Sequence, residues 1–140
     1  MGKQRVLILC TGNSARSQMA EGLLREIAGD RFEVFSAGTR PAGLNPNALT
    51  AMTEIGIDIS GHRSKSVDEF EGQQFDYVIT VCDKAKESCP IFPGTGKRIH
   101  HSFEDPAAVP AERQLRLSRR VRDEMSGWLW EFFVVEQQNP

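Results

Sequence analysis

Hydrophobic residues along the chain form continuous runs in some segments and recur every three or four residues in others. Residues 5–9 are a mostly apolar run, which is typical of a strand covered on both faces of a sheet. Four apolar residues after it share one face of a helix that Gly29 ends: Ala20, Leu23, Leu24 and Ile27. The same reasoning predicts three more strands, at residues 32–37, 75–82 and 98–103.

Two further helices complete the pattern. Asn45 is a cap followed by proline, and it opens a helix that continues to Gly56. A long helix over residues 112–136 carries a predicted apolar stripe made of Leu117, Val121, Met125, Trp128 and Phe132. Trp130 lies off that stripe and is a candidate surface contact. Strands alternating with helices predict an α/β fold of three layers, with a central, mostly parallel four-stranded sheet and helices on both faces.

Length and composition limit the function classes. We expect residues 1–140 to form one domain, long enough to bury its own core. A net charge of -2 gives no basic field for nucleic acid. The first apolar run is too short for a membrane span and lacks the layout of a signal peptide. We therefore expect a cytoplasmic monomer without nucleic-acid or membrane partners, in which three cysteines are more often reactive thiols than a disulfide framework.

The most informative segment joins the first strand to the first helix. It is a Cys-x5-Arg loop followed by Ser17, and its residues are Cys10, Thr11, Gly12, Asn13, Ser14, Ala15 and Arg16. Backbone N–H groups at such a junction point toward one centre and suit a tetrahedral oxyanion. The helix N-terminus and Arg16 both favour a thiolate at Cys10, although a lone cysteine at a strand end is more often a small buried hydrophobe. The loop predicts an active site with Cys10 as nucleophile and residues 11–17 as the substrate-binding groups.

Two more cysteines, Cys82 and Cys89, directly follow the third predicted strand. Zinc is disfavoured because Cys-x6-Cys is wider than the usual ligand spacing, and no metal is expected. Good helix formers fill the segment between them behind Asp83, a candidate cap. Seven residues of helix separate two Cα atoms by about 10 Å, whereas a disulfide needs about 4.4–6.8 Å. The pair can therefore bond only if the helix unwinds; two inert core thiols are the alternative.

The run CTGNSARSQMAE resembles the opening of the low-molecular-weight protein tyrosine phosphatase superfamily. Within it, the chain looks most like the thioredoxin-coupled arsenate reductases, which carry a nucleophilic cysteine in the loop and a cysteine pair further on. Cys10, Cys82 and Cys89 match that pattern. The resemblance implies a three-thiol relay that reduces arsenate to arsenite, with Cys82 and Cys89 as the redox shuttle, thioredoxin as the reductant and no cofactor.

The resemblance also assigns roles around the loop. The general acid of the family lies in an Asp-Pro step, and Asp105 occupies the only such step here, with Asp83 as the weaker alternative. Without the Cys10 loop, Asp105 would be interpreted as a turn residue. Ser17 is expected to donate a hydrogen bond to the Cys10 thiolate, and Asn13 to fix the shape of the loop.

Potassium-binding members of the family build a cation site behind the loop. This chain supplies Asn13, Glu21 and Ser36 but has Lys65 in place of the last acid. We expect the Lys65 ammonium to occupy the position of the ion and to pair with Glu21. The alternative is an ordinary solvated charge.

Two other functions remain open from the sequence. The first is a low-molecular-weight tyrosine phosphatase using Cys10, Arg16 and Asp105, which gives Cys82 and Cys89 no role. The second is a non-catalytic oxyanion-binding or phospho-carrier module, a class whose loops generally lack the arginine.

Overall fold

The computed structural model describes residues 2–136, in which strands and helices alternate. The strands of this part are β1 (Gln4–Cys10), β2 (Phe32–Gly38), β3 (Tyr77–Thr80) and β4 (Lys97–His100). Its α-helices are α1 (Arg16–Ala28), α2 (Pro46–Thr53), α3 (Asp83–Ser88) and α4 (Ala111–Trp130). Two short 3-10 turns are η1 (Val67–Phe70) and η2 (Pro106–Ala108), and a π-helical turn, η3 (Glu131–Val135), continues α4.

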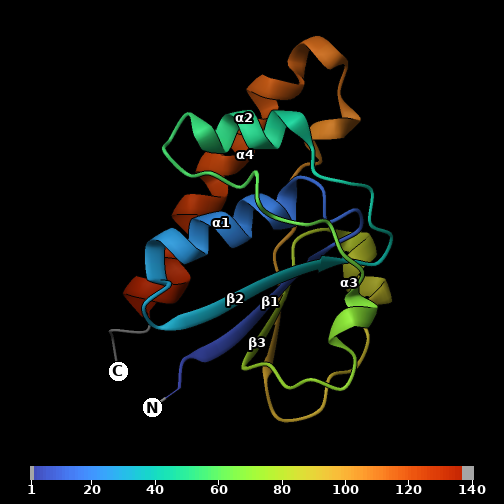
Figure 1. The fold of residues 1–140 in the computed structure, drawn as a ribbon, viewed down its shortest axis with the longest axis vertical. Coiled ribbons are helices and arrows are strands. Elements are labelled where there is room, and N and C mark those ends of the chain that lie inside the picture. The colour runs from blue at the N-terminus through green and yellow to red at the C-terminus, as the bar shows by residue number, and fades with distance from the viewer. Residues whose placement is uncertain (1, 137–140) are drawn as a thin grey trace.

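The strands form one parallel sheet in the order β2-β1-β3-β4 (Figure 1). β1 is its buried centre, and Val6, Leu7, Ile8 and Leu9 have no exposed surface. The chain leaves β1 toward β2 and returns on the other side of β1 at β3. Ligands of open parallel sheets bind at the carboxyl ends of the strands where the order reverses in this way. The expected ligand-binding position in this sheet is therefore at the carboxyl ends of β1 and β3.

Helices cover both faces of the sheet, as the sequence predicts. In Figure 1, α1, α2 and α4 lie together on one side of the sheet, whereas α3 lies on the other. α4 packs along both α1 and α2. The fold is the predicted three-layer α/β arrangement, with every strand pair of the described chain parallel.

The buried stripe of the last helix is Leu117, Val121, Met125, Leu129 and Phe133. The prediction was correct as far as Met125 and wrong beyond it, because Trp128 and Phe132 are only partly buried. The π-turn begins at Glu131, and Phe133 packs edge-on against Phe32 with ring centroids 5.0 Å apart. Trp130 is 51% exposed, as its place off the stripe predicts.

β3 and β4 are both shorter than predicted. The ladder between them ends at Thr80 and His100, but the chain beyond β4 stays attached to β3. The N–H of His101 donates to the carbonyl of Thr80, and the N–H of Phe103 donates to the carbonyl of Val81. These bonds hold the segment that leads to Asp105 beside the carboxyl end of β3.

α2 begins as predicted. The Asn45 side-chain oxygen accepts hydrogen bonds from the N–H groups of Asn47 and Ala48, which is the geometry of a helix cap. The helix ends at Thr53, before the predicted Gly56.

Gly38 lets β2 approach the Cys10 loop closely. It is the register partner of Cys10, and a Cβ placed on it would lie 2.6 Å from the carbonyl oxygen of Thr11 and 2.8 Å from the nitrogen of Asn13. These are backbone atoms, which cannot swing aside as the end of a flexible side chain can. Glycine is therefore required for the loop to rest on β2.

We predict that Gly38→Ala lowers the free energy of unfolding by about 1–3 kcal/mol, because the loop and β2 must move apart. Gly127→Ala is the matched control, since nothing lies within 4 Å of a Cβ at this exposed helical position. It should raise the free energy of unfolding by about 0.5–1 kcal/mol. Urea denaturation measures both, and an unchanged midpoint for Gly38→Ala would contradict the close contact.

Candidate active site

The Cys10 loop lies where the sequence predicts, between the end of β1 and the start of α1. Cys10 is 2% exposed, and its Sγ lies 2.9 Å from Oγ of Ser17. The carbonyls of the loop point outward. Those of Cys10, Thr11, Gly12 and Ser14 each accept a backbone hydrogen bond from residues 39–45. The N–H groups of residues 11–15 have no acceptor among the described residues, so they remain available to an oxyanion.

Asn13 fixes the loop, as predicted. Its backbone is in the left-handed region at φ 44, where asparagine is tolerated better than most residues. Its side-chain nitrogen donates to Oγ of Ser17 at 2.8 Å and to Oγ of Ser36 at 2.9 Å. Its side-chain oxygen accepts from the N–H of Lys65 at 2.9 Å and from Nε2 of Gln18 at 3.0 Å. The amide therefore ties the loop to β2, to α1 and to the segment before η1.

These bonds also set the direction in which the Ser17 hydroxyl points. Ser36 donates to the buried carboxylate of Glu21 at 2.5 Å, so its oxygen is free to accept from Asn13. Ser17 accepts from Asn13 as well, which leaves its own hydrogen for the sulfur of Cys10. A hydroxyl donor stabilises the charged form of a thiol.

Arg16 and Asp105 meet above the loop. Arg16 Nη1 donates to the carbonyl of Phe103 at 3.1 Å, and its Nη2 lies 3.6 Å from Oδ2 of Asp105. The other oxygen of Asp105 accepts from the N–H of Ala107 at 2.9 Å, which caps η2. The Asp105 side chain is 45% exposed, so it faces both the site and water. The structure thus brings both predicted residues to the mouth of the loop.

A cavity of about 300 Å³ opens over this arrangement. Its lining residues are Thr11, Arg16, Cys82, Asp83, Lys84, Ser102 and Asp105. Lys84 and Ser102 were missed by the sequence reasoning. Both are neighbours of residues that it did single out, but only the folded chain shows that they face the loop.

Cys82 lies beside the loop because β1 and β3 are parallel neighbours. It is 4% exposed, and its Sγ lies 3.3 Å from the side-chain oxygen of Thr11. Cys82 and Cys89 are the residues flanking α3, and all three thiols are free. The helix between them is present as predicted, and Ala85 is its only buried residue.

Asp83 does not cap α3, contrary to the prediction. Cys82 holds the cap position without a side-chain hydrogen bond, and Asp83 is the first helical residue. The Asp83 carboxylate is instead paired with Nε2 of His100 at 2.8 Å. Nδ1 of the same ring lies 2.7 Å from Oγ1 of Thr80. The strand end therefore holds the first turn of α3 through one histidine.

Cys89 is less buried than the other two thiols. Its Sγ donates weakly to the carbonyl of Pro90 at 3.5 Å. Burial raises the pKa of the Cys89 thiol, and the neighbouring Arg98 only partly opposes this effect. Burial therefore disfavours the nucleophilic thiolate of Cys89 while α3 is folded.

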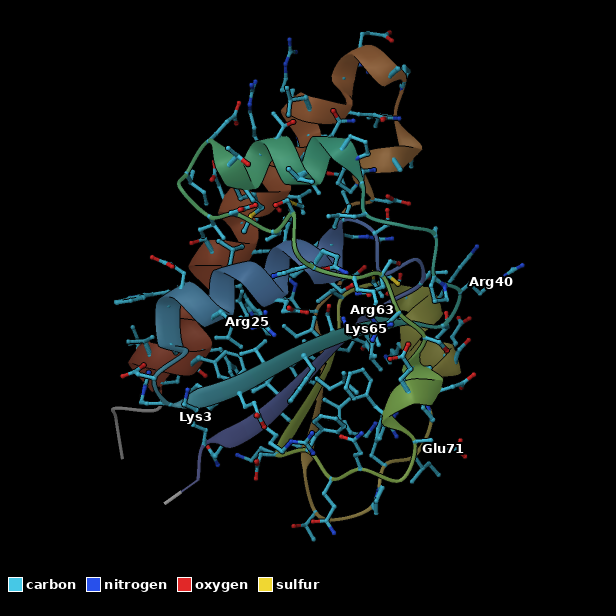
Figure 2. All side chains as sticks on the ribbon, viewed as in Figure 1. Lys3, Arg25, Arg40, Arg63, Lys65 and Glu71 are labelled. Atoms are coloured by element: carbon cyan, nitrogen blue, oxygen red, sulfur yellow. The ribbon has the colours of Figure 1, made fainter. Side chains whose placement is uncertain are left out.

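Lys65 pairs with Glu21, as predicted. Its Nζ lies 3.9 Å from Oε1 of Glu21 and donates to the carbonyl of Arg63 at 3.1 Å. Figure 2 shows Lys65 and Arg63 close together beside the end of β2, whereas Arg40 points outward into solvent. Burial lowers the pKa of the Lys65 ammonium, and the Glu21 carboxylate opposes this change. With 13% of its side chain exposed, Lys65 is not an ordinary solvated charge.

Glu21 has two other basic neighbours. Arg25 Nη1 lies 2.8 Å from it and His62 Nε2 lies 3.5 Å from it. Burial is the main reason that the pKa of His62 is lowered, with Glu21 acting in the opposite direction. The side-chain nitrogen of Gln18 donates to Asn13 and to the carbonyl of Arg63. The side-chain oxygen of Gln18 is the acceptor that remains, and it accepts from Nδ1 of His62 at 2.9 Å.

Residues 2–136 contain no group of three or more histidine, cysteine or acidic side chains arranged to hold a metal ion. In the same part of the chain, no helix has the length and apolar character needed to cross a membrane.

A Cys-x5-Arg loop at the carboxyl end of the central strand of a parallel sheet defines a cysteine-dependent, phosphatase-like protein. The chain belongs to the low molecular weight phosphotyrosine protein phosphatase family, whose model matches residues 5–104. An arsenate reductase of Halalkalibacterium halodurans is 46% identical to it over 127 residues, which are 89% of this chain and 91% of that protein.

Two solved structures are similar over nearly the whole chain. One is a thioredoxin-dependent arsenate reductase of Corynebacterium glutamicum, with a TM-score of 0.76 and 30% identity. The alignment covers 99% of this chain and 64% of that one. The other is an arsenate reductase in its oxidized state, with a TM-score of 0.78 and 29% identity, covering 91% and 95% of the two chains.

If the Lys65 ammonium takes the place of a bound cation, potassium should not stabilise this protein. We predict equal melting temperatures in potassium chloride and choline chloride at matched ionic strength. Lys65→Asp restores the acid of the potassium-binding pattern and should melt at a higher temperature in the potassium salt. A potassium-dependent rise in the wild-type melting temperature would contradict the interpretation.

Proposed function

We propose that this protein is an arsenate reductase that passes electrons through Cys10, Cys82 and Cys89 and is recycled by thioredoxin. The observation that carries the proposal is the position of Cys82, whose sulfur lies 3.3 Å from the first residue after Cys10. A phosphatase needs no second thiol there. The Halalkalibacterium relative supports arsenate as the substrate, and the Corynebacterium structure supports thioredoxin as the reductant.

The first step is attack of the Cys10 thiolate on the arsenic of arsenate. Residues 11–17 hold the arsenate oxygens, and the loop N–H groups and the guanidinium of Arg16 balance their negative charge. Asp105 protonates the oxygen that leaves, so water departs and a bond between sulfur and arsenic remains. The separation of 3.6 Å between Arg16 and Asp105 places acid and guanidinium around the same volume.

The second step moves electrons from sulfur to arsenic. Cys82 attacks the sulfur of Cys10, and the sulfur–arsenic bond breaks with its electron pair staying on arsenic. Arsenic is thereby reduced to arsenite, while the two thiols are oxidised to a Cys10–Cys82 disulfide. Cys82 starts from a position in contact with the Cys10 loop, because β1 and β3 hold the two cysteines at the same edge of the sheet.

The third step transfers the disulfide outward. Cys89 attacks Cys82 and releases Cys10 as a thiol, and a dithiol such as that of thioredoxin then reduces the Cys82–Cys89 bond. α3 must unwind first, since a folded helix keeps its flanking residues beyond disulfide reach. Unwinding also exposes the Cys89 thiol and so removes the burial that raises its pKa.

We further propose that residues 1–140 act as one monomeric domain.

A tyrosine phosphatase is the second candidate. Cys10, Arg16 and Asp105 would support weak phosphatase activity on a small, activated ester. Among the described residues, Phe103 lies two positions before the acid but cannot grip a phosphotyrosine ring, because it is 5% exposed and stacked on His101 at 4.4 Å. We therefore assign phosphatase activity to the side reaction.

The relay predicts different losses for the three thiols. Cys10→Ser should abolish both arsenate reduction and hydrolysis of p-nitrophenyl phosphate, because Cys10 alone meets the oxyanion. Cys82→Ser and Cys89→Ser should stop repeated turnover and retain the hydrolysis. The readout is arsenate-dependent NADPH oxidation with thioredoxin and thioredoxin reductase.

The same variants separate the two shuttle thiols. Cys89→Ser should release about one arsenite per enzyme and accumulate a Cys10–Cys82 disulfide, visible by mass spectrometry of peptides. Cys82→Ser should form no such bond. Sustained thioredoxin-coupled turnover by Cys82→Ser would refute the relay.

We also predict that residues 83–93 change backbone structure with oxidation. Amide exchange and protease cleavage in this segment should increase in the protein carrying the Cys82–Cys89 disulfide, with the sheet unchanged. Cys89→Ser treated with the same oxidant is the matched control and should retain the reduced pattern. An identical backbone in the reduced and oxidised proteins would exclude the switch.

A further inference from the structure

The cavity over the Cys10 loop contains a cation that the relay does not use. Its charged lining residues are two bases, Arg16 and Lys84, and two acids, Asp83 and Asp105. Arsenate is an anion at neutral pH, so the distribution of these charges decides how well the cavity attracts it. Both acids have partners that compete with Lys84.

Asp105 is engaged by Arg16 and by the N–H of Ala107. Asp83 is engaged by His100, whose ring is in turn bonded to Thr80. Lys84 forms no ion pair or side-chain hydrogen bond with any residue of the described chain. Its ammonium is therefore left for a ligand of the cavity.

The backbone of α3 determines where this ammonium lies. Asp83 precedes Lys84 and is anchored to β4 through His100, so the first turn of α3 is fixed against the strand end. Lys86, two residues further along, lines a different cavity, together with Cys89, Arg98 and His100. The two lysines of one short helix are thus directed to different places.

We propose that Lys84 is a second oxyanion-binding cation of the active site. Its ammonium attracts arsenate into the cavity, and it moves out of the cavity when α3 unwinds. This inference rests on the proposed function. Arg16 binds the oxyanion from the loop, whereas Lys84 approaches from the helix that must open later in the cycle. The attraction is therefore present in the reduced enzyme and lost in the oxidised one.

The chemistry of the product gives this arrangement a purpose. Arsenite is released as a neutral acid near pH 7, so an ammonium that attracts arsenate does not retain it. After oxidation Cys10 is free again, but Cys82 is bonded to Cys89 and cannot complete a second reduction until the disulfide is reduced. Loss of Lys84 at that stage weakens the binding of competing oxyanions such as phosphate.

Inorganic phosphate tests the inference without turnover. Its affinity for the reduced protein, measured by titration calorimetry, should fall roughly three- to tenfold in Lys84→Gln, as expected for one exposed charge that faces a focusing cavity. Lys84→Arg should retain the wild-type affinity. Lys86→Gln is the matched control in the same helix and should equal the wild type. Equal affinities for Lys84→Gln and Lys86→Gln would overturn the proposal.

Oxidation provides the second arm of the experiment. In the wild type, formation of the Cys82–Cys89 disulfide should weaken phosphate binding by about the same factor as the Lys84→Gln substitution does in the reduced protein. In Lys84→Gln itself, the disulfide should weaken phosphate binding much less. An equal loss in both proteins would show that Lys84 is not the group removed by unwinding.

Kinetics separate recruitment from an effect on the thiols. Lys84→Gln should raise the KM for arsenate and leave kcat unchanged at saturating arsenate. A lowered kcat with unchanged KM and phosphate affinity would place Lys84 with Cys82 instead and overturn the proposal. Because phosphate binding needs no reductase activity, it can confirm Lys84 even if arsenate proves not to be reduced.

Discussion

The side-chain amide of Asn13 is the interaction on which the site depends. Its nitrogen and oxygen together bond four partners, which belong to α1, to β2 and to the segment that holds Lys65. It also carries the left-handed backbone that turns the loop. Buried polar networks of this kind are effective only when every member is satisfied, because an unpaired buried group is costly in a low-dielectric interior. The loop geometry and the orientation of Ser17 depend on this residue, and the glycine at position 38 leaves the space in which the loop rests on β2.

Behind Asn13 lies a carboxylate that is almost completely buried. Glu21 is 3% exposed, and the Arg25 and Lys65 cations compensate its charge. Ser36 donates to this carboxylate and accepts from Asn13, which links Glu21 to the loop. Arg25 comes from the same helix as Glu21, whereas Lys65 comes from the distant segment before η1. The loop is therefore rigid because distant parts of the chain converge on it, and a rigid oxyanion site costs no reorganisation when the substrate binds.

The sequence was sufficient for features that depend on local pattern. The buried run of β1, the Asn45 cap and the helix between Cys82 and Cys89 were predicted because each is encoded within a few consecutive residues. The loop residues from Cys10 to Ser17 were identified in the same way. Features that depend on packing were missed or misplaced. The buried stripe continues from Met125 at four-residue steps to Leu129 and Phe133, and the apolar pattern alone did not separate these residues from Trp128 and Phe132. Asp83 bonds to His100, which only the sheet brings near it.

Apart from the Asp83–His100 pair at its first turn, α3 is held to the rest of the described chain mainly by one buried side chain. Its six residues bury one side chain, Ala85, whose methyl group contributes about 0.8 kcal/mol, and a helix of this length is marginal in water on its own. Helices this short form and melt on the order of microseconds, whereas thiol–disulfide exchange takes seconds or longer without a catalyst. The segment thus equilibrates between its two forms many times before a bond between sulfur atoms is made. Thiol–disulfide exchange therefore limits the rate of the relay, and the folding and unfolding of α3 do not.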